Sequence, residues 1–262
     1  MYSISDLNGD GTRDVVCSSE GGSASASVLL NTGRQLFHTI YSPLTYYSPK
    51  MIFTADLNAD GWPDYYVLSS SDDPEIMQGL YFGLNLRTPA TQGAGAGQTD
   101  GKANLSRLFE TGVFLPLSTL FALDTCDVNQ DNYTDFVGTT SSGFFYLRNM
   151  RNNTFQQFEL QHHNSTSMVS CYDMDGDSYP DIVGYGGRDS SLWWFRNNGG
   201  HNFTAHPISD NLPIYTSQAV ADLNNDLRPG RCDQIDISTY LGGQLSFRRL
   251  ALTLLLRAFL QI

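Results

Sequence analysis

The chain has 262 residues and a net charge of -12, because 27 Asp and Glu residues outnumber 15 Lys and Arg residues. Such an acidic chain is poorly suited to bind nucleic acid or to insert into an anionic membrane surface, so we expect neither partner. Its length allows one sizeable core, and 24 glycines with 12% aromatic residues suit short strands and tight turns. We therefore expect an all-β domain.

The N-terminus carries no secretory signal, because the residues after Met1 run into an acidic segment without a basic or an apolar stretch. Either the chain is cytosolic or its true start is missing. Because the first repeat opens within five residues of Met1, we expect a missing start and a protein that reaches the cell surface or the extracellular space.

The cysteines have no CxxC or zinc-site spacing, and four of them in a chain of this length do not predict a disulfide framework. They are Cys17, Cys126, Cys171 and Cys232. We expect buried free thiols.

A nine-residue acidic motif, Asp-x-Asn/Asp-x-Asp-x-x-x-Asp, recurs along the chain. Complete copies cover residues 6–14, 56–64, 127–135 and 173–181, and a fifth copy at 222–230 has Gly in place of the last Asp. Their first residues are 50, 71, 46 and 49 positions apart. Repeats of this length are typical of propeller blades.

An Asn and a Phe also recur at similar distances after the acidic motif. In three units an Asn follows the first Asp of the motif by 22 to 25 residues and a Phe follows that Asn by six, as in Asn149 and Phe155. The long second unit has its Asn at residue 85 and a Gly-rich polar stretch after it. We expect a flexible insertion over about 87–104 in this blade.

Each unit predicts four short strands, because runs of β-branched and aromatic residues flank the motif. Examples are 51–55 before it, 64–68 after it, and 144–147 and 155–158 further on. The pair Asn198-Gly199 predicts a type I′ hairpin between the last two strands of its unit. Four antiparallel strands per repeat are the plan of a β-propeller blade.

The predicted propeller spans residues 1–249, with repeats that begin near residues 1, 51, 121, 168 and 217. The remaining segment, 250–262, is apolar, but it is too short to cross a bilayer and contains Arg257. A last strand, an unrelated helix and a misassigned terminus remain open for it.

The acidic motif predicts a calcium site. Oxygens at positions 1, 3 and 5 of a tight loop converge, the carbonyl at position 7 joins them, and the Asp at position 9 completes an all-oxygen cage that suits a hard cation. The alternative is that Asp, Asn and Gly only form turns. The candidate ligands are Asp6, Asn8, Asp10, Thr12 and Asp14; Asp56, Asn58, Asp60, Trp62 and Asp64; Asp127, Asn129, Asp131, Tyr133 and Asp135; Asp173, Asp175, Asp177, Tyr179 and Asp181.

The fifth copy offers only Asp222, Asn224 and Asp226, and we expect a weak site or an empty turn there. An EF-hand is excluded, because position 12 is not acidic in any of the complete copies and strands, not helices, flank the loops.

This pattern, followed by Val or Ile and by a downstream Arg-Asn or Asn-Gly hairpin, resembles FG-GAP/VCBS-type repeats, as in the head of integrin alpha subunits. The resemblance implies a propeller with calcium between the first and second strands of each blade. It also implies roles in cell adhesion, in glycan binding or beside enzyme domains. Asn132 and Ser178 replace the loop Gly in two copies, and five repeats are fewer than seven blades, so the ring need not close.

No catalytic motif accompanies these repeats, and we expect no enzyme activity. The five histidines lack metal-site spacing and are expected to be structural or on the surface. Carboxylates that point at a cation are poor general acids or bases.

Three aromatic residues, Trp62, Tyr133 and Tyr179, share position 7 of successive loops. They are candidates for a rim that binds a sugar or a protein, and the alternative is that each packs on a neighbouring blade. Candidate glycosylation sites are Asn104, Asn152, Asn164 and Asn202.

We therefore expect a calcium-binding extracellular recognition or adhesion module for protein or carbohydrate ligands. The alternative is an accessory propeller of a larger secreted carbohydrate- or lipid-active enzyme.

Overall fold

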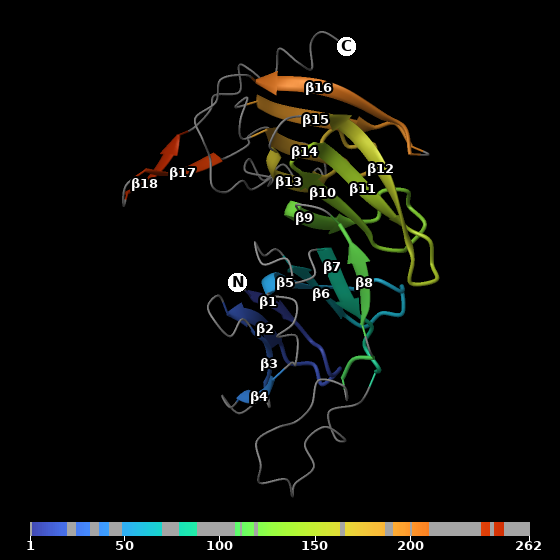
Figure 1. Cartoon of the computed structure of the whole chain (residues 1–262), viewed down its shortest axis with the longest axis vertical. Helices are drawn as coiled ribbons and strands as arrows, with labels where there is room; N and C mark the ends of the chain where they lie inside the picture. Colours follow the sequence, from blue (N-terminus) through green and yellow to red (C-terminus); the bar gives the residue numbers. More distant parts are fainter. Residues whose placement is uncertain are drawn as a thin grey trace, which may run out of the picture. The chain divides into compact units, whose positions relative to one another are not determined.

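The computed structural model describes residues 2–19, 25–31, 37–41, 49–69, 79–87, 108–110, 112–117, 120–162, 166–186, 191–199, 201–209, 237–241 and 244–248. Within these ranges the regular structure is entirely β, and no helix there is long and apolar enough to cross a membrane (Figure 1). The chain divides into two compact units, Met1–Thr119 and Leu120–Ile262.

The first unit contains two four-stranded antiparallel sheets, each a meander in chain order. The first sheet consists of β1 (Tyr2–Ser5), β2 (Asp14–Ser19), β3 (Ser25–Asn31) and β4 (Phe37–Tyr41). The second consists of β5 (Pro49–Ala55), β6 (Asp64–Ser69), β7 (Gly79–Gly83) and β8 (Val113–Pro116).

The second unit repeats the plan with two further four-stranded sheets and a separate hairpin. The third sheet consists of β9 (Leu120–Cys126), β10 (Asp135–Thr140), β11 (Gly143–Asn149) and β12 (Phe155–His162). The fourth consists of β13 (Thr166–Tyr172), β14 (Asp181–Gly186), β15 (Ser191–Asn197) and β16 (Phe203–Ser209), and the hairpin of β17 (Ile237–Leu241) and β18 (Gln244–Arg248).

Face-to-face packing of neighbouring sheets explains why the inner strands are continuous apolar runs without alternation. Every residue of β6 and of β14 is buried. In the first unit Val16 and Val28 pack in one core cluster with Ile52 and Val67 of the next sheet. Burial on both faces removes the solvent side that would otherwise favour polar residues.

One glycine shows how close the sheets of the second unit approach. A Cβ atom on Gly184 of β14 would lie 2.1 Å from Cε1 of Phe144 of β11. The ring therefore occupies the space that a side chain would need, which accounts for glycine within this strand.

The all-β architecture of four blade-like antiparallel sheets is confirmed, and it is consistent with an incomplete β-propeller. The predicted strands before and after each complete acidic motif are present. Most of the predicted insertion, the fifth motif and the segment 250–262 lie outside the described residues.

Two predictions are wrong. The expectation that the cysteines are free fails for Cys126 and Cys171, which form a disulfide between β9 and β13. Spacing could not reveal it, because the two residues are 45 positions apart and meet only when two sheets pack together. Cys17 is a free thiol and is half-buried, and Cys232 lies outside the described residues.

The second wrong prediction concerns the turn at Asn198-Gly199. The connection between β15 and β16 is five residues long and not two, and it is closed by a hydrogen bond of 2.8 Å from the Asn198 N–H to the Asn202 carbonyl. Gly199 has a positive φ of 79°, but Asn198 does not adopt the positive φ that a type I′ turn requires.

Candidate metal loops

The four complete acidic motifs, 6–14, 56–64, 127–135 and 173–181, connect the first and second strands of the four sheets, and we call them the acidic loops. Position 6 has a left-handed backbone in each, with φ values of 82° at Gly11, 85° at Gly61, 66° at Asn132 and 75° at Ser178. Asn132 and Ser178 therefore adopt the conformation that glycine adopts in the first two loops. The two departures from the Gly pattern do not change the course of the backbone.

Hydrogen bonds from the main chain to acidic side chains shape each loop. In the second loop, Asp56 accepts the N–H groups of Asp60 and Gly61 at 3.0 and 2.8 Å. Asn58 Oδ1 also accepts the Asp60 N–H at 3.1 Å, and Asp60 Oδ1 accepts the Trp62 N–H at 2.8 Å. The side chains at positions 1, 3 and 5 therefore turn their oxygens toward the inside of a tight turn.

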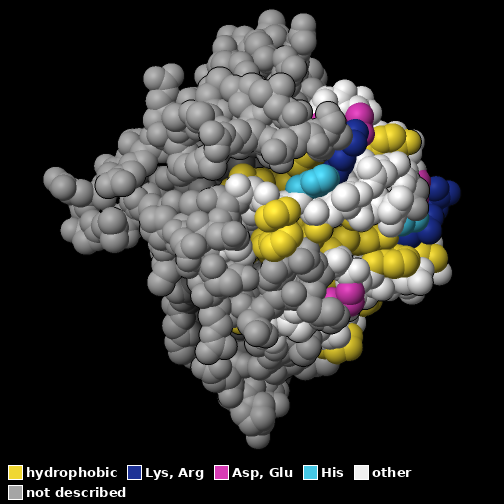
Figure 2. Space-filling model, turned by 90° about the horizontal axis from the view of Figure 1, so that it is seen from above, with side chains coloured by type: hydrophobic (Ala, Val, Ile, Leu, Met, Phe, Trp, Pro, Cys, Tyr) yellow, Lys and Arg dark blue, Asp and Glu magenta, His cyan; other side chains and the backbone are white. Residues whose placement is uncertain are grey.

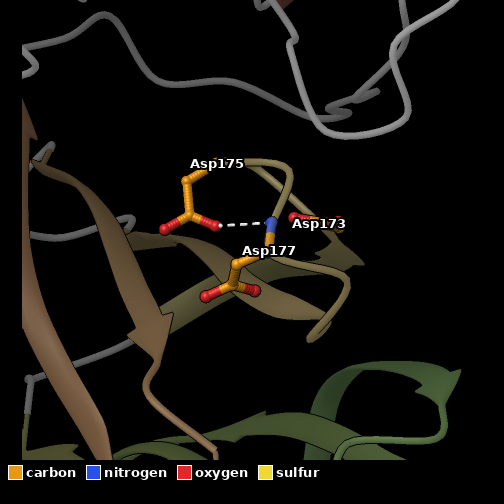
Figure 3. A group of neighbouring side chains, drawn as sticks. All are labelled: Asp173, Asp175 and Asp177. Atoms are coloured by element: carbon orange, nitrogen blue, oxygen red, sulfur yellow. Dashed lines mark hydrogen bonds between the residues drawn. The ribbon is translucent and has the colours of Figure 1, made fainter.

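The fourth loop has three carboxylates at these positions. Ligand oxygens of Asp173, Asp175 and Asp177 all lie within 4.8 Å of one another (Figure 3). Asp175 also accepts the Asp177 N–H at 3.2 Å. Carboxylates this close repel one another unless a cation or protons offset their charge.

The Asp at position 9 has a structural function that the sequence analysis did not assign. Asp64 is fully buried and accepts the Leu57 N–H at 2.8 Å and the Asn85 N–H at 2.7 Å. Equivalent pairs of hydrogen bonds form at Asp14, Asp135 and Asp181. This residue ties the start of each acidic loop to the end of the third strand or just beyond it.

Burial raises the pKa of the position-9 carboxyls. It raises the pKa of Asp64 and of Asp181 to about 7 and that of Asp135 to about 6, despite the main-chain hydrogen bonds that lower it. Burial also raises the pKa of Asp14. Nearby loop carboxylates raise the pKa of each carboxyl further, and a bound cation would lower it.

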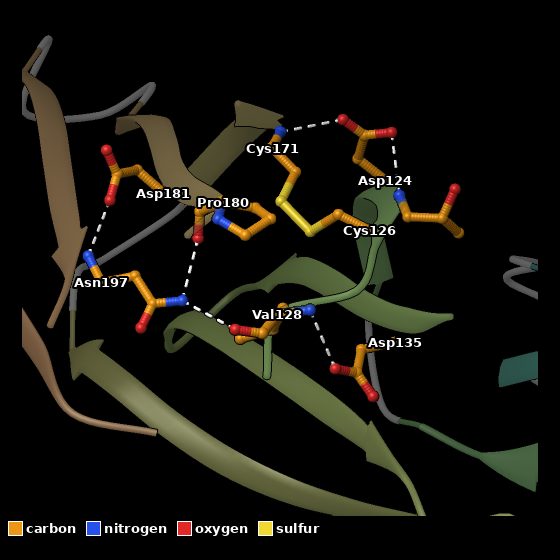
Figure 4. Close-up of a disulfide and its surroundings, with 9 residues drawn as sticks. Asp124, Cys126, Val128, Asp135, Cys171, Pro180, Asp181 and Asn197 are labelled. Atoms are coloured by element: carbon orange, nitrogen blue, oxygen red, sulfur yellow. Dashed lines mark hydrogen bonds between the residues drawn. A yellow bond between two sulfur atoms is a disulfide. The ribbon is translucent and has the colours of Figure 1, made fainter. Parts of the chain in front are cut away.

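We call Asn31, Asn85, Asn149 and Asn197, which marked the repeat in the sequence, the hairpin asparagines, and one of them in each unit donates a hydrogen bond to the preceding sheet. Nδ2 of Asn85 donates to the Leu7 carbonyl of the preceding sheet at 2.8 Å. Nδ2 of Asn197 donates in the same way to the Val128 carbonyl at 2.8 Å and also to the Pro180 carbonyl at 3.0 Å (Figure 4). The sequence register revealed these residues but not their partners.

The donor set of the acidic loops fits calcium. Positions 1, 3 and 5 offer carboxylate and amide oxygens and position 7 offers a carbonyl, which are the ligands that calcium prefers, with the position-9 carboxylate behind them. In the third loop Oδ2 of Asp131 is buried without a hydrogen bond and lies 3.2 Å from a guanidinium nitrogen of Arg151. A buried carboxylate oxygen with spare acceptor capacity is the kind of atom that a cation can coordinate.

The aromatic residues at position 7 are all half-buried, and their surroundings differ. Trp62 lies over the first loop, because a Cβ on Gly9 would be 2.3 Å from its Cη2 atom. Tyr133 lies beneath the Arg151 guanidinium at 5.1 Å from the ring centroid. Tyr179 lies beside Gly199 of its own sheet, 3.3 Å from a Cβ placed there. Trp62 therefore packs against the neighbouring sheet, and the two tyrosines contact hairpins of their own sheets.

The other sequence candidates are partly within the described residues. Asn152 and Asn202 are exposed, whereas Asn104 and Asn164 lie outside them. His201 stacks on Tyr146 and Phe158, which is a structural position. On the face drawn in Figure 2, the described part displays hydrophobic side chains among separate acidic, basic and histidine side chains.

Comparison with known proteins supports the repeat pattern. A family model described as FG-GAP-like repeat matches residues 6–67 and 173–229, so the chain contains FG-GAP-like repeats in two regions, as the resemblance predicted. No curated protein sequence matches the chain significantly.

Solved structures share the fold. A lectin from Agrocybe aegerita, described as recognising non-reducing terminal N-acetylglucosamine, is 18% identical with a TM-score of 0.56 over 91% of this chain and 60% of its own. The Photorhabdus luminescens Tc holotoxin pore is 18% identical with a TM-score of 0.51 over 96% of this chain and 11% of its own. The chain therefore spans less than two thirds of either neighbour.

Proposed function

We propose that this chain is a non-catalytic, extracellular recognition module that binds carbohydrate and whose blades are stabilised by calcium in the acidic loops. The observation that carries the proposal is the repetition of one oxygen-rich loop at the same place in four sheets. A turn that served only to reverse the chain would not need three acidic or amide side chains directed inward in each copy.

Calcium would be held by the side chains at positions 1, 3 and 5 and by the carbonyl at position 7, with the position-9 carboxylate behind them. When bound, the cation supplies positive charge that offsets the repulsion among the loop carboxylates. The residues of the chain fix the turn, bury the position-9 Asp and connect each loop to the following strands. None of these functions requires proton transfer, which is why we assign no catalytic step.

Two features support an extracellular location. The disulfide between Cys126 and Cys171 is typical of proteins in oxidising compartments, and the sequon residues Asn152 and Asn202 are exposed to glycosylation. The calcium affinity of extracellular modules, with Kd values of roughly 10⁻⁴ to 10⁻³ M, matches loops of this kind.

Carbohydrate is the ligand class favoured by the fold shared with the Agrocybe aegerita lectin. Tyr133 and Tyr179 are half-buried at position 7, where an aromatic ring can stack on a sugar face. Trp62 is half-buried as well, but its ring packs on the first loop, so less of it is available to a sugar.

A glycan-binding assay tests this proposal. The full chain, produced in the presence of calcium, is titrated with a panel that includes glycans ending in non-reducing N-acetylglucosamine. We expect binding to at least one class, and weaker binding by Tyr133→Ala and Tyr179→Ala. Folded protein that binds none of the panel would contradict the carbohydrate assignment, and unchanged binding by both variants would place the ligand elsewhere.

An accessory module of a larger secreted enzyme is the second candidate. It is favoured by the match to only 11% of the holotoxin chain, which shows that such a fold can form a small part of a large protein. A full-length transcript distinguishes the two, because a catalytic domain next to the repeats would support the accessory function.

A further inference from the structure

We propose that Arg87 and Arg151 are tethered counter-cations, which hold the second and third acidic loops when calcium is absent and lower the affinity of those loops for it. This inference rests on the proposed calcium binding and concerns residues to which the repeat pattern gives no function. It predicts that the acidic loops differ in affinity although their ligands are alike.

The ion pairs at the two loops join the same two positions of the repeat. Nε and Nη2 of Arg87 lie 2.9 and 2.8 Å from Oδ2 of Asp60, and Nη2 of Arg151 lies 3.2 Å from Oδ2 of Asp131. In both cases the partner is the carboxylate at position 5, and the oxygen contacted is the one that does not accept the position-7 N–H. The guanidinium therefore neutralises an oxygen that a calcium ion would coordinate.

The backbone holds both arginines in the same position and conformation of the repeat. Each lies two residues after a hairpin asparagine, and each donates its N–H to that asparagine's Oδ1 at 2.9 Å. Each has a positive φ, 54° at Arg87 and 67° at Arg151, where the fourth sheet has Gly199. A non-glycine residue in the left-handed region is uncommon, so a long cationic side chain in two such positions indicates that its charge is used there.

The two side chains of each ion pair differ in their exposure to solvent. The Asp60 and Asp131 side chains are only 7% and 13% exposed, whereas the arginine side chains are 55% and 56% exposed. A positive partner stabilises a carboxylate that is largely removed from water, and an exposed guanidinium loses little when it returns to water. The arginines can therefore leave when a divalent cation enters.

The other two loops provide the comparison. In the fourth loop the cation comes from a different position: Nε of Arg196, on β15, lies 2.5 Å from Oδ2 of Asp175 and its Nη2 lies 3.8 Å from Oδ2 of Asp177. In the first loop, among the described residues, Asp10 accepts hydrogen bonds from Thr12 and Asn8 and forms no ion pair. We therefore expect the first loop to bind calcium most tightly.

The test is calorimetric titration of the decalcified full chain with calcium chloride, together with thermal melts in chelator. In Arg87→Gln/Arg151→Gln, two sites should bind calcium about tenfold more tightly, because a unit charge ~6 Å from a divalent cation has about this effect even in water. The variant should also melt at a lower temperature than the wild type in chelator and gain more from calcium. Arg87→Lys/Arg151→Lys, which keeps the charge, should retain most of the weak affinity.

Arg13→Gln is the matched control, because Arg13 is exposed in the first loop and forms no ion pair with the described residues. Tightening of two sites in this control, and not of the first loop alone, would overturn the inference, since it would show a general charge effect. Calcium binding that is the same in the wild type and the double variant would also overturn it while leaving the calcium loops intact. Binding in neither protein would refute both, and binding in the variant alone would support the inference most strongly.

Discussion

The two units use different chemistry at one equivalent position between sheets. In the first unit Ser5, directly before its acidic loop, donates a hydrogen bond of 2.9 Å to Thr54, two residues before the next loop. In the second unit Cys126 and Cys171 occupy these same two places, and a disulfide joins them (Figure 4). One interface is therefore closed by a hydroxyl pair and the other by a covalent bond.

The comparison shows that the disulfide does not define how neighbouring sheets meet. Both interfaces also have a hairpin asparagine that donates to the preceding loop, Asn85 in one unit and Asn197 in the other. The recurring geometry comes from these hydrogen bonds and from face-to-face apolar packing. The disulfide adds stability to an arrangement that forms without one in the first unit.

Removal of calcium should have the largest effect, and it should affect both units. Each loop would stabilise the fold by about 1.4 kcal/mol at ~1 mM calcium and a Kd of ~100 μM, so four loops contribute roughly 5 to 6 kcal/mol. We expect a large drop in Tm with chelator and little recovery with magnesium, and we expect the first unit to become protease-sensitive before the second. Identical melts under all three conditions would mean that the loops are only turns.

Single-loop variants sharpen this result. Asp10→Asn keeps an acceptor for the Thr12 N–H but removes a ligand charge, and Asp177→Asn does the same for the Tyr179 N–H. Each should reduce the calcium-dependent gain in Tm by about one loop's share. Asp226→Asn should change little, because its loop lacks the last Asp.

Exchange of the hydroxyl pair and the disulfide between the two units should have the next largest effect on stability. Cys126→Ser/Cys171→Thr, which copies the first unit, should lose about 2 to 4 kcal/mol of stability. Ser5→Cys/Thr54→Cys should form a second disulfide and raise Tm under non-reducing conditions only. Denaturant melts with and without reductant measure both changes, and a wild-type melt that reductant leaves unaltered would show that the existing disulfide contributes nothing.

Loss of a hairpin asparagine should cost less. Asn85→Ala and Asn197→Ala each remove donors to two carbonyls, one of them in the preceding sheet. We expect about 1 to 3 kcal/mol for each, because buried carbonyls lose their partners. If the disulfide compensates, the cost of Asn197→Ala should rise in the Cys126→Ser/Cys171→Thr variant; equal costs with and without the disulfide would show that the two linkages act independently.

Titration of the buried position-9 carboxyls should make stability depend on pH. Asp64 and Asp181 have a folded pKa of about 7 and Asp135 one of about 6, all above the usual value of 3.8. Because the folded state then holds protons that the unfolded state has released, stability should fall as pH rises from about 4 to about 7. In chelator we therefore expect a lower Tm at pH 8 than at pH 5.

Calcium should flatten this profile by favouring the ionised form. Burial lowers the pKa of His201, which acts in the opposite direction, so the comparison is best made with His201→Phe, which retains the ring stack. A profile in chelator that rises from pH 5 to pH 8 in this variant would contradict the assignment of the three buried carboxyls.

The sequence predicted the parts of the fold that repeat locally. Strand runs and acidic loops depend on residues close in the chain, so period and composition were sufficient to place β6 next to 56–64. The contacts between sheets were not predictable in this way. Leu7 and Asn85 are 78 residues apart, and Cys126 and Cys171 meet only through packing. Likewise, the structural function of Asp64 depends on Asn85, whose N–H it accepts across the sheet.

The direction of the hydrogen bonds from hairpin asparagines has a consequence for biosynthesis. In each unit the carbonyl acceptor, Leu7 or Val128, is made before its donor, Asn85 or Asn197. Within each unit the interface between the two sheets can therefore form in the order in which the chain emerges.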